Sequence, residues 1–118
     1  MPSSAYNPDE VLAALERQDY EAVLQGALPH ANAGNSSAQC MVSLLYQCGF
    51  GLPRDLAKAE EWLLKAAAQD NPLAWNNLGT LYIIGGAGLT HGPEKATESY
   101  VRAKELGFDC AEPYRPGV

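Results

Sequence analysis

Apolar residues in the stretch 38–48 recur three and four positions apart, which is the spacing of one face of an α-helix. They are Ala38, Met41, Val42, Leu45 and Tyr46. Gly49 and Gly51 follow and predict the end of this helix, because glycine accepts the left-handed backbone of a tight turn. Asp55 is suited to cap a second helix, which we expect to run to about Gln69.

The same pattern returns further along the chain. The pairs Ala38/Ala74, Leu45/Leu81, Tyr46/Tyr82 and Gly49/Gly85 match at an offset of 36 residues, and Lys58/Lys95, Ala59/Ala96 and Ala66/Ala103 match at 37 after one inserted residue in the Gly-rich turn 85–88. Recurrence at this period predicts two stacked helical pairs, residues 36–71 and 72–107. Gly92 stands where the first copy has Asp55, so the last helix should lack a capping side chain.

Residues 8–35 have the features of a divergent third copy, with apolar residues on one face of each of two short helices. Pro29 should kink the second of these helices or end it early. Residues 108–118 begin a further copy that Pro113 and Pro116 stop, so they form a cap or a tail. In a cap, Phe108 and Tyr114 would fold back on Tyr100 and Ala103 at the last helical pair, and in a tail they would be disordered. We expect one repeat domain over residues 1–118.

Composition supports a helical fold. The chain has 118 residues, with 18 Ala and 15 Leu but only 5 Val, 2 Ile and 3 Thr. Ala and Leu favour helices, whereas β-branched residues favour strands. We therefore predict an all-α protein with about six helices.

These residues resemble the Sel-one-like repeat family, a relative of the tetratricopeptide repeat. The resemblance rests in the first copy on Ala38, Leu45, Tyr46, Gly49, Gly51, Asp55, Lys58, Ala59, Trp62, Ala66, Ala67 and Asn71, and in the second on Ala74, Leu78, Gly79, Leu81, Tyr82, Gly85, Gly88, Lys95, Ala96, Tyr100, Ala103 and Gly107. It implies a short right-handed solenoid of αα hairpins that binds protein partners on a concave surface. Ser43 and Asp70 replace glycines of the family pattern.

The resemblance also implies that the first helix of each repeat lines the concave surface. Once the core positions are assigned, the residues left for partner binding are Cys40, Leu44, Gln47, Cys48, Asn76, Thr80, Ile83 and Ile84. Apolar residues framed by amides are typical of a protein-binding groove. The alternative is that these residues pack against another helix, the carboxy-terminal tail or a second subunit.

We find no constellation typical of catalysis. His30 and His91 have no partner motif, and Cys40 and Cys48 lie about 12 Å apart along one helix, too far to form a disulfide or share a metal. Glu60 and Glu61 are interpreted as solvated carboxylates on a helix surface. The sequence thus predicts no catalytic residues, no metal, no cofactor and no enzyme.

The net charge is −6, which disfavours nucleic-acid and anionic-membrane partners. Residues 1–35 carry five acids and one Arg, a net charge of −4, which favours a basic partner or serves as a solvated face. The start of the chain has no signal-peptide pattern, so a cytoplasmic location is expected. The leading hypothesis is a bacterial adaptor or scaffold that binds a protein or peptide, as a monomer or weak homo-oligomer. The alternatives are an immunity or inhibitor protein that neutralises a toxin or effector, and a structural homo-oligomer.

Overall fold

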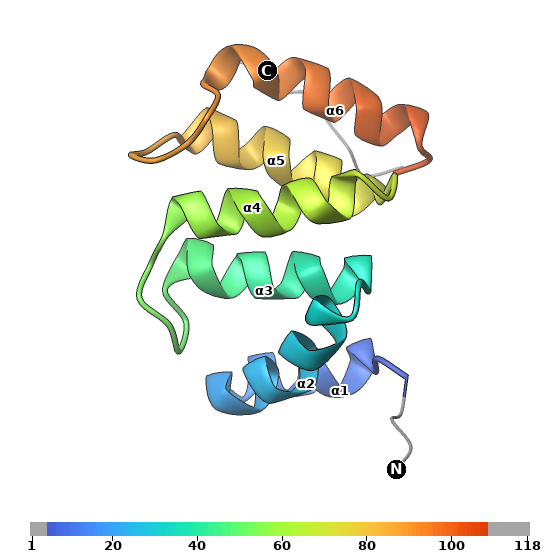
Figure 1. Cartoon of the computed structure of the whole chain (residues 1–118), viewed down its shortest axis with the longest axis vertical. Coiled ribbons are helices and arrows are strands. Elements are labelled where there is room, and N and C mark those ends of the chain that lie inside the picture. Colours follow the sequence, from blue (N-terminus) through green and yellow to red (C-terminus); the bar gives the residue numbers. More distant parts are fainter. Residues whose placement is uncertain (1–4, 109–118) are drawn as a thin grey trace.

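Six α-helices follow one another in a computed structural model that describes residues 5–108. They are α1 (Pro8–Glu16), α2 (Tyr20–Asn32), α3 (Ser36–Cys48), α4 (Leu56–Ala67), α5 (Pro72–Ile84) and α6 (Ala96–Glu105), with a short 3₁₀ turn at Pro93–Lys95 before α6. Figure 1 shows them stacked as successive helical pairs along the long axis, from α1 and α2 at one end to α5 and α6 at the other. The described residues contain no strand, so the predicted all-α repeat fold is confirmed.

Polar side chains cap five of the six helices, and Asp55 is among them, as predicted. The side-chain oxygens of Asn7, Asp19, Asn35, Asp55 and Asn71 each accept a backbone N–H from the first turn of the helix that follows. No side chain caps α6, which confirms the consequence expected from Gly92. Because each cap satisfies an N–H group that the helix itself leaves free, these residues define where the helices begin.

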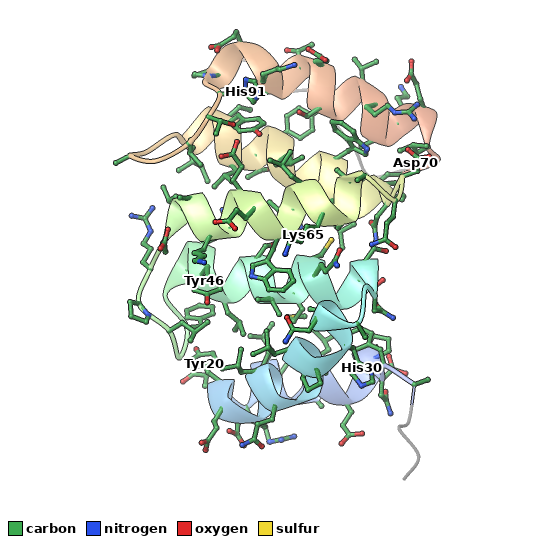
Figure 2. All side chains as sticks on the ribbon, in the orientation of Figure 1. Tyr20, His30, Tyr46, Lys65, Asp70 and His91 are labelled. Carbon is green, nitrogen blue, oxygen red and sulfur yellow. The ribbon has the colours of Figure 1, made fainter. Side chains whose placement is uncertain are left out.

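The turns between helical pairs use a left-handed residue at the same place each time. Gly34, Asp70 and Gly107 follow the second helix of each pair with φ of 103°, 59° and 96°. Asp70, labelled in Figure 2, takes this conformation although it carries a side chain. Its Oδ1 lies 3.2 Å from the Arg102 guanidinium. The family-type glycine missing from the sequence is therefore replaced by a residue that keeps the same turn and also pairs with α6.

Pro29 does not end α2 early, contrary to one of the two outcomes predicted for it. The helix continues to Asn32 with Pro29 inside it. Pro29 stands close to the end of α2, and the carbonyls of Pro29, His30 and Ala31 still accept the backbone N–H groups of Ala33, Asn35 and Gly34. A proline has no N–H to donate to the carbonyl four residues earlier, so one helical hydrogen bond is missing. The bonds that the carbonyls of Pro29, His30 and Ala31 accept nevertheless close the last turn.

The buried apolar side chains form three clusters. Two of them lie among α1, α2 and α3, and the third joins Cys40 of α3 to residues of α4, α5 and α6. Where α5 packs against α6, a Cβ atom on Gly79 would lie 2.9 Å from the Tyr100 ring. Glycine is therefore required there because Tyr100 occupies the space that a side chain would need.

We expect Gly79→Ser to lower the free energy of unfolding by about 1–3 kcal/mol, the usual cost of overpacking a core. The corresponding residues of the first repeat are Ser43 and Leu63, both buried. The double variant Gly79→Ser/Tyr100→Leu recreates that pair, so its loss in urea denaturation should be smaller than the sum of the single variants. Strict additivity would contradict this account of the crossing.

Candidate functional site

Helices α3 and α5, the first helices of two successive pairs, contain no charged residue. Every Asp, Glu, Lys and Arg of the described helices lies on α1, α2, α4, α6 or the 3₁₀ turn. The two uncharged helices contact each other across the pair boundary. Their solvent-facing side chains thus form a surface of amides, hydroxyls and apolar groups.

A groove opens between these two helices. Leu44 and Gln47 of α3 face Asn77 and Thr80 of α5 across it, and Ser43 completes the lining. Its volume is about 190 Å³. Gln47 and Asn77 offer amides next to the Leu44 methyl groups. The Ser43 hydroxyl donates to the Cys40 carbonyl at 2.6 Å, and the Thr80 hydroxyl lies 3.3 Å from the Asn76 carbonyl. We call these five residues the α3–α5 groove.

The structure divides the eight residues predicted for partner binding. Leu44, Gln47 and Thr80 come together in the α3–α5 groove, and Asn76 is half-buried on α5. Cys48 and Ile84 are exposed at the ends of their helices, Ile84 with 58 % of its surface accessible. Ile83 is only partly accessible because it packs against the core.

Cys40 is predicted to lie on the partner-binding surface, but the structure buries it. It is only 3 % exposed and belongs to the core formed with α4, α5 and α6. Burial raises the pKa of its thiol to about 12, which keeps the sulfur protonated. The register equivalent, Asn76, stays half-buried because no described helical pair follows α6, whereas the next pair covers Cys40.

Sequence reasoning missed Asn77, the remaining amide of the groove. A signal was present, because Asn77, Thr80 and Ile84 are spaced three and four residues apart and so share one face of α5. Thr80 itself is fixed on this face, since its hydroxyl lies 2.9 Å from the Tyr100 hydroxyl of α6. The face is thus built by α5 and held in place by α6.

Glu60 is buried rather than solvated, which corrects the interpretation of the Glu60–Glu61 pair. Its carboxylate accepts hydrogen bonds from the Tyr82 hydroxyl at 2.7 Å and from the Thr90 N–H and hydroxyl at 3.0 and 2.5 Å. Burial, followed by the hydrogen bond and charge of Glu60, raises the pKa of Tyr82. The His91 ring, labelled in Figure 2, packs edge-on against Tyr82, and the two rings stand nearly perpendicular with 5.6 Å between their centroids. These contacts attach the 85–92 loop to α4, so this carboxylate has a structural use.

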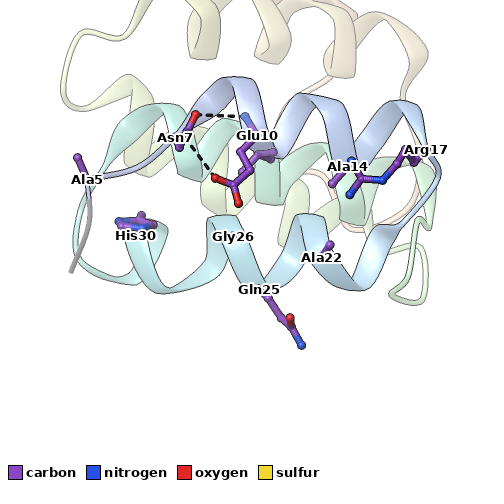
Figure 3. A pocket seen from close by; sticks show the side chains of 10 residues that line it. Ala5, Asn7, Glu10, Ala14, Arg17, Ala22, Gln25, Gly26 and His30 are labelled. Atoms are coloured by element: carbon purple, nitrogen blue, oxygen red, sulfur yellow. Dashed lines mark hydrogen bonds between the residues drawn. The ribbon is translucent and has the colours of Figure 1, made fainter. Parts of the chain in front are cut away.

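A second hollow, about 280 Å³, lies between α1 and α2 (Figure 3). Apart from Gln25, its polar side chains take part in other contacts. Asn7 caps α1 and donates to Glu10, Arg17 lies 4.0 Å from Asp19, and the His30 ring packs 5.7 Å from Tyr6. These groups do not converge on one point, so the α3–α5 groove is the better candidate for recognition.

Residues 5–108 hold no group of three or more His, Cys, Asp or Glu side chains placed to bind a metal ion. None of their helices has the length and apolar character needed to cross a membrane.

Comparisons with known proteins support the repeat assignment. The family model described as Sel1 repeat matches residues 36–71. The fold is similar to the crystal structure of a Sel1 repeat protein from Oxalobacter formigenes, with 28 % sequence identity and a TM-score of 0.71 over 86 % of this chain. This chain spans 40 % of that protein's length. No curated protein matches the sequence. The resemblance to the Sel1-like repeat family is confirmed, and proteins of this kind generally mediate protein–protein interactions.

We expect Tyr82→Phe to lower the free energy of unfolding by about 1–3 kcal/mol, because it removes a donor from a buried carboxylate. Tyr46 is the matched control, since it occupies the same place in the first repeat and no described residue bonds its hydroxyl. Tyr46→Phe should change stability by less than roughly 0.5 kcal/mol. Urea denaturation followed by far-UV circular dichroism measures both, and equal losses would contradict the role assigned to Glu60.

Proposed function

We propose that this Sel1-like repeat chain is a non-enzymatic interaction module that binds a protein or peptide in the α3–α5 groove. The observation that supports the proposal most directly is the lining of that groove, which combines uncharged amide and hydroxyl groups with an accessible leucine. We also propose that residues 8–35 and 72–107 act as further repeats of the same array, that residues 108–118 serve as its cap, and that the module is cytoplasmic.

The size and chemistry of the groove favour a peptide over a small molecule. Its volume of about 190 Å³ is below the roughly 300–1,000 Å³ of ordinary small-molecule pockets. Gln47 and Asn77 each carry an amide donor and acceptor, which match the N–H and C=O groups of an extended backbone. A charged side chain would lose hydration in this groove without gaining a counter-ion, so the bound segment should be uncharged where it enters.

Charge outside the groove supports a basic partner. Five exposed acids lie on or next to α1 and α2, namely Asp9, Glu10, Glu16, Asp19 and Glu21, against Arg17 alone. Such a surface accelerates the encounter with a positively charged protein. The bound partner would thus combine an uncharged segment in the groove with basic residues that face the amino-terminal helices.

This acidic surface also favours the alternative role of an immunity or inhibitor protein for a basic toxin or effector. The two roles differ in consequence, because an inhibitor abolishes its partner's activity whereas an adaptor leaves that activity intact. A structural homo-oligomer differs from both in solution mass, which light scattering measures.

The groove generates a prediction for Leu44→Lys/Asn77→Lys. Both side chains are partly exposed, so we expect an almost unchanged melting temperature but loss of the native partner in pull-downs analysed by mass spectrometry. Thr97→Lys, an exposed position on α6 away from the groove, is the matched control and should retain the partner. Recovery of the same proteins by both variants would refute the groove as the binding site.

The acidic surface generates a separate prediction about rates. Raising salt from about 0.05 to 0.5 M should slow association with the partner and change dissociation less, because screening acts on long-range attraction. Charge reversal at Glu16 and Glu21, both exposed, should reduce this salt dependence. An association rate independent of salt would contradict the hypothesis of a basic partner. It would not contradict binding in the α3–α5 groove.

A further inference from the structure

Trp75 lies where α4, α5 and α6 meet, with a cavity on each side. A cavity of about 120 Å³ separates it from Leu64 of α4, and a more open groove of about 500 Å³ separates it from Val101 of α6. Its indole Nε1–H is shielded from solvent, yet within residues 5–108 it finds no hydrogen-bond acceptor. A buried donor without an acceptor costs free energy, so a segment that brought a carbonyl or hydroxyl oxygen to this N–H would gain stability from the contact.

The corresponding position of the first repeat is fully satisfied. Gln39 lies 36 residues before Trp75, and its Nε2 donates to the Ala31 carbonyl at 3.1 Å. The Gln39 Oε1 accepts from Gln69 at 3.2 Å. The place that Gln39 fills with bonded polar groups is filled in the second repeat by an indole whose N–H has no acceptor within residues 5–108.

The surroundings of Trp75 are apolar and accessible. Leu64 and Val101 stand at equivalent positions of α4 and α6, and they are 42 % and 46 % exposed. Both contribute to the cavities that Trp75 lines. Exposed aliphatic groups on either side of a tryptophan form a surface that gains stability when a further segment covers it.

The chain itself leaves the described region at the rim of this surface. Arg102 and Glu105, on the last turns of α6, line the groove beside Trp75, and the Phe108 N–H donates to the Ala103 carbonyl at the end of the same helix. Residues 109–118 continue from there. In an extended conformation these ten residues would span about 31 Å, twice the roughly 15 Å length of α6. The segment is therefore long enough to run back along the groove.

The sequence of this segment suits the groove chemically. It contains Pro113-Tyr114-Arg115-Pro116, and prolines at this spacing favour the polyproline II conformation. The backbone carbonyls of that conformation make no internal hydrogen bonds, so they are free to accept from an indole N–H. Tyr114 and the two prolines supply apolar surface that could cover the exposed Leu64 and Val101 side chains.

We propose that residues 109–118 dock in an extended conformation over Trp75, between α4 and α6. A backbone carbonyl of the segment accepts the Trp75 Nε1–H, and its proline and tyrosine rings cover Leu64 and Val101. This docking rests on the cap role proposed above for residues 108–118, and it covers the exposed apolar face of the last described helical pair from within one chain. This surface is separate from the α3–α5 groove, because none of its residues lines that groove.

The indole N–H signals in ¹H–¹⁵N correlation spectra test this docking. The chain has two tryptophans, Trp62 and Trp75, and Trp62→Phe assigns their peaks. Deleting residues 109–118 should shift the Trp75 peak and accelerate exchange of its N–H with solvent roughly fivefold, the factor expected for one typical hydrogen bond. The Trp62 peak, the internal control, should not move. A synthetic peptide with the sequence of residues 109–118 should return the Trp75 peak toward its position in the full chain.

A second variant keeps the full length of the chain. Pro113→Ala/Pro116→Ala leaves all residues of the six helices unchanged and should shift the Trp75 peak in the same direction as the deletion. A Trp75 peak that is unchanged in both variants would overturn the proposal. A peak position that depends on protein concentration, together with a dimer mass in light scattering, would show exchange of the segment between two copies and would overturn docking within one chain.

Discussion

A pair of short helices cannot bury its own apolar face, and this constraint governs the rest of the molecule. Each pair gains a core only by stacking on the next, so the surroundings of a side chain depend on which pairs flank it. Cys40 and Asn76 occupy equivalent positions, yet the following pair buries Cys40 while Asn76 stays half-buried. The same stacking explains why Gly79 is required beside Tyr100.

Stacking also determines where charge is tolerated. Helices α3 and α5 are in contact with each other and with neighbours on either side, and neither contains a charged residue. The buried Glu60 on α4 is tolerated because three hydrogen bonds satisfy its carboxylate. An uncharged groove beside an acidic amino-terminal end is the outcome, and this combination suits a partner whose bound segment is neutral and whose flanks are basic.

Two surfaces of different chemistry match the two binding events that we propose. The α3–α5 groove presents amides and hydroxyls that suit an exchangeable peptide partner. The surface around Trp75 presents aliphatic groups and one unsatisfied donor, which suit a segment that stays bound. Because no residue lines both surfaces, docking at Trp75 would leave the proposed peptide groove open.

The sequence by itself determined the helices, their caps and their pairing. Asp55 and Asn71 cap helices through contacts three residues away or fewer, and the repeated register at 36–37 residues follows from spacing alone. It also identified Leu44, Gln47 and Thr80, which the structure brings into one groove. Burial of Cys40 and Glu60 and isolation of the Trp75 N–H were decided only by tertiary structure. The physical reason is that caps and turns are formed by neighbours in the chain, whereas burial and hydrogen bonding in a stacked array depend on residues 20 to 30 or more positions away.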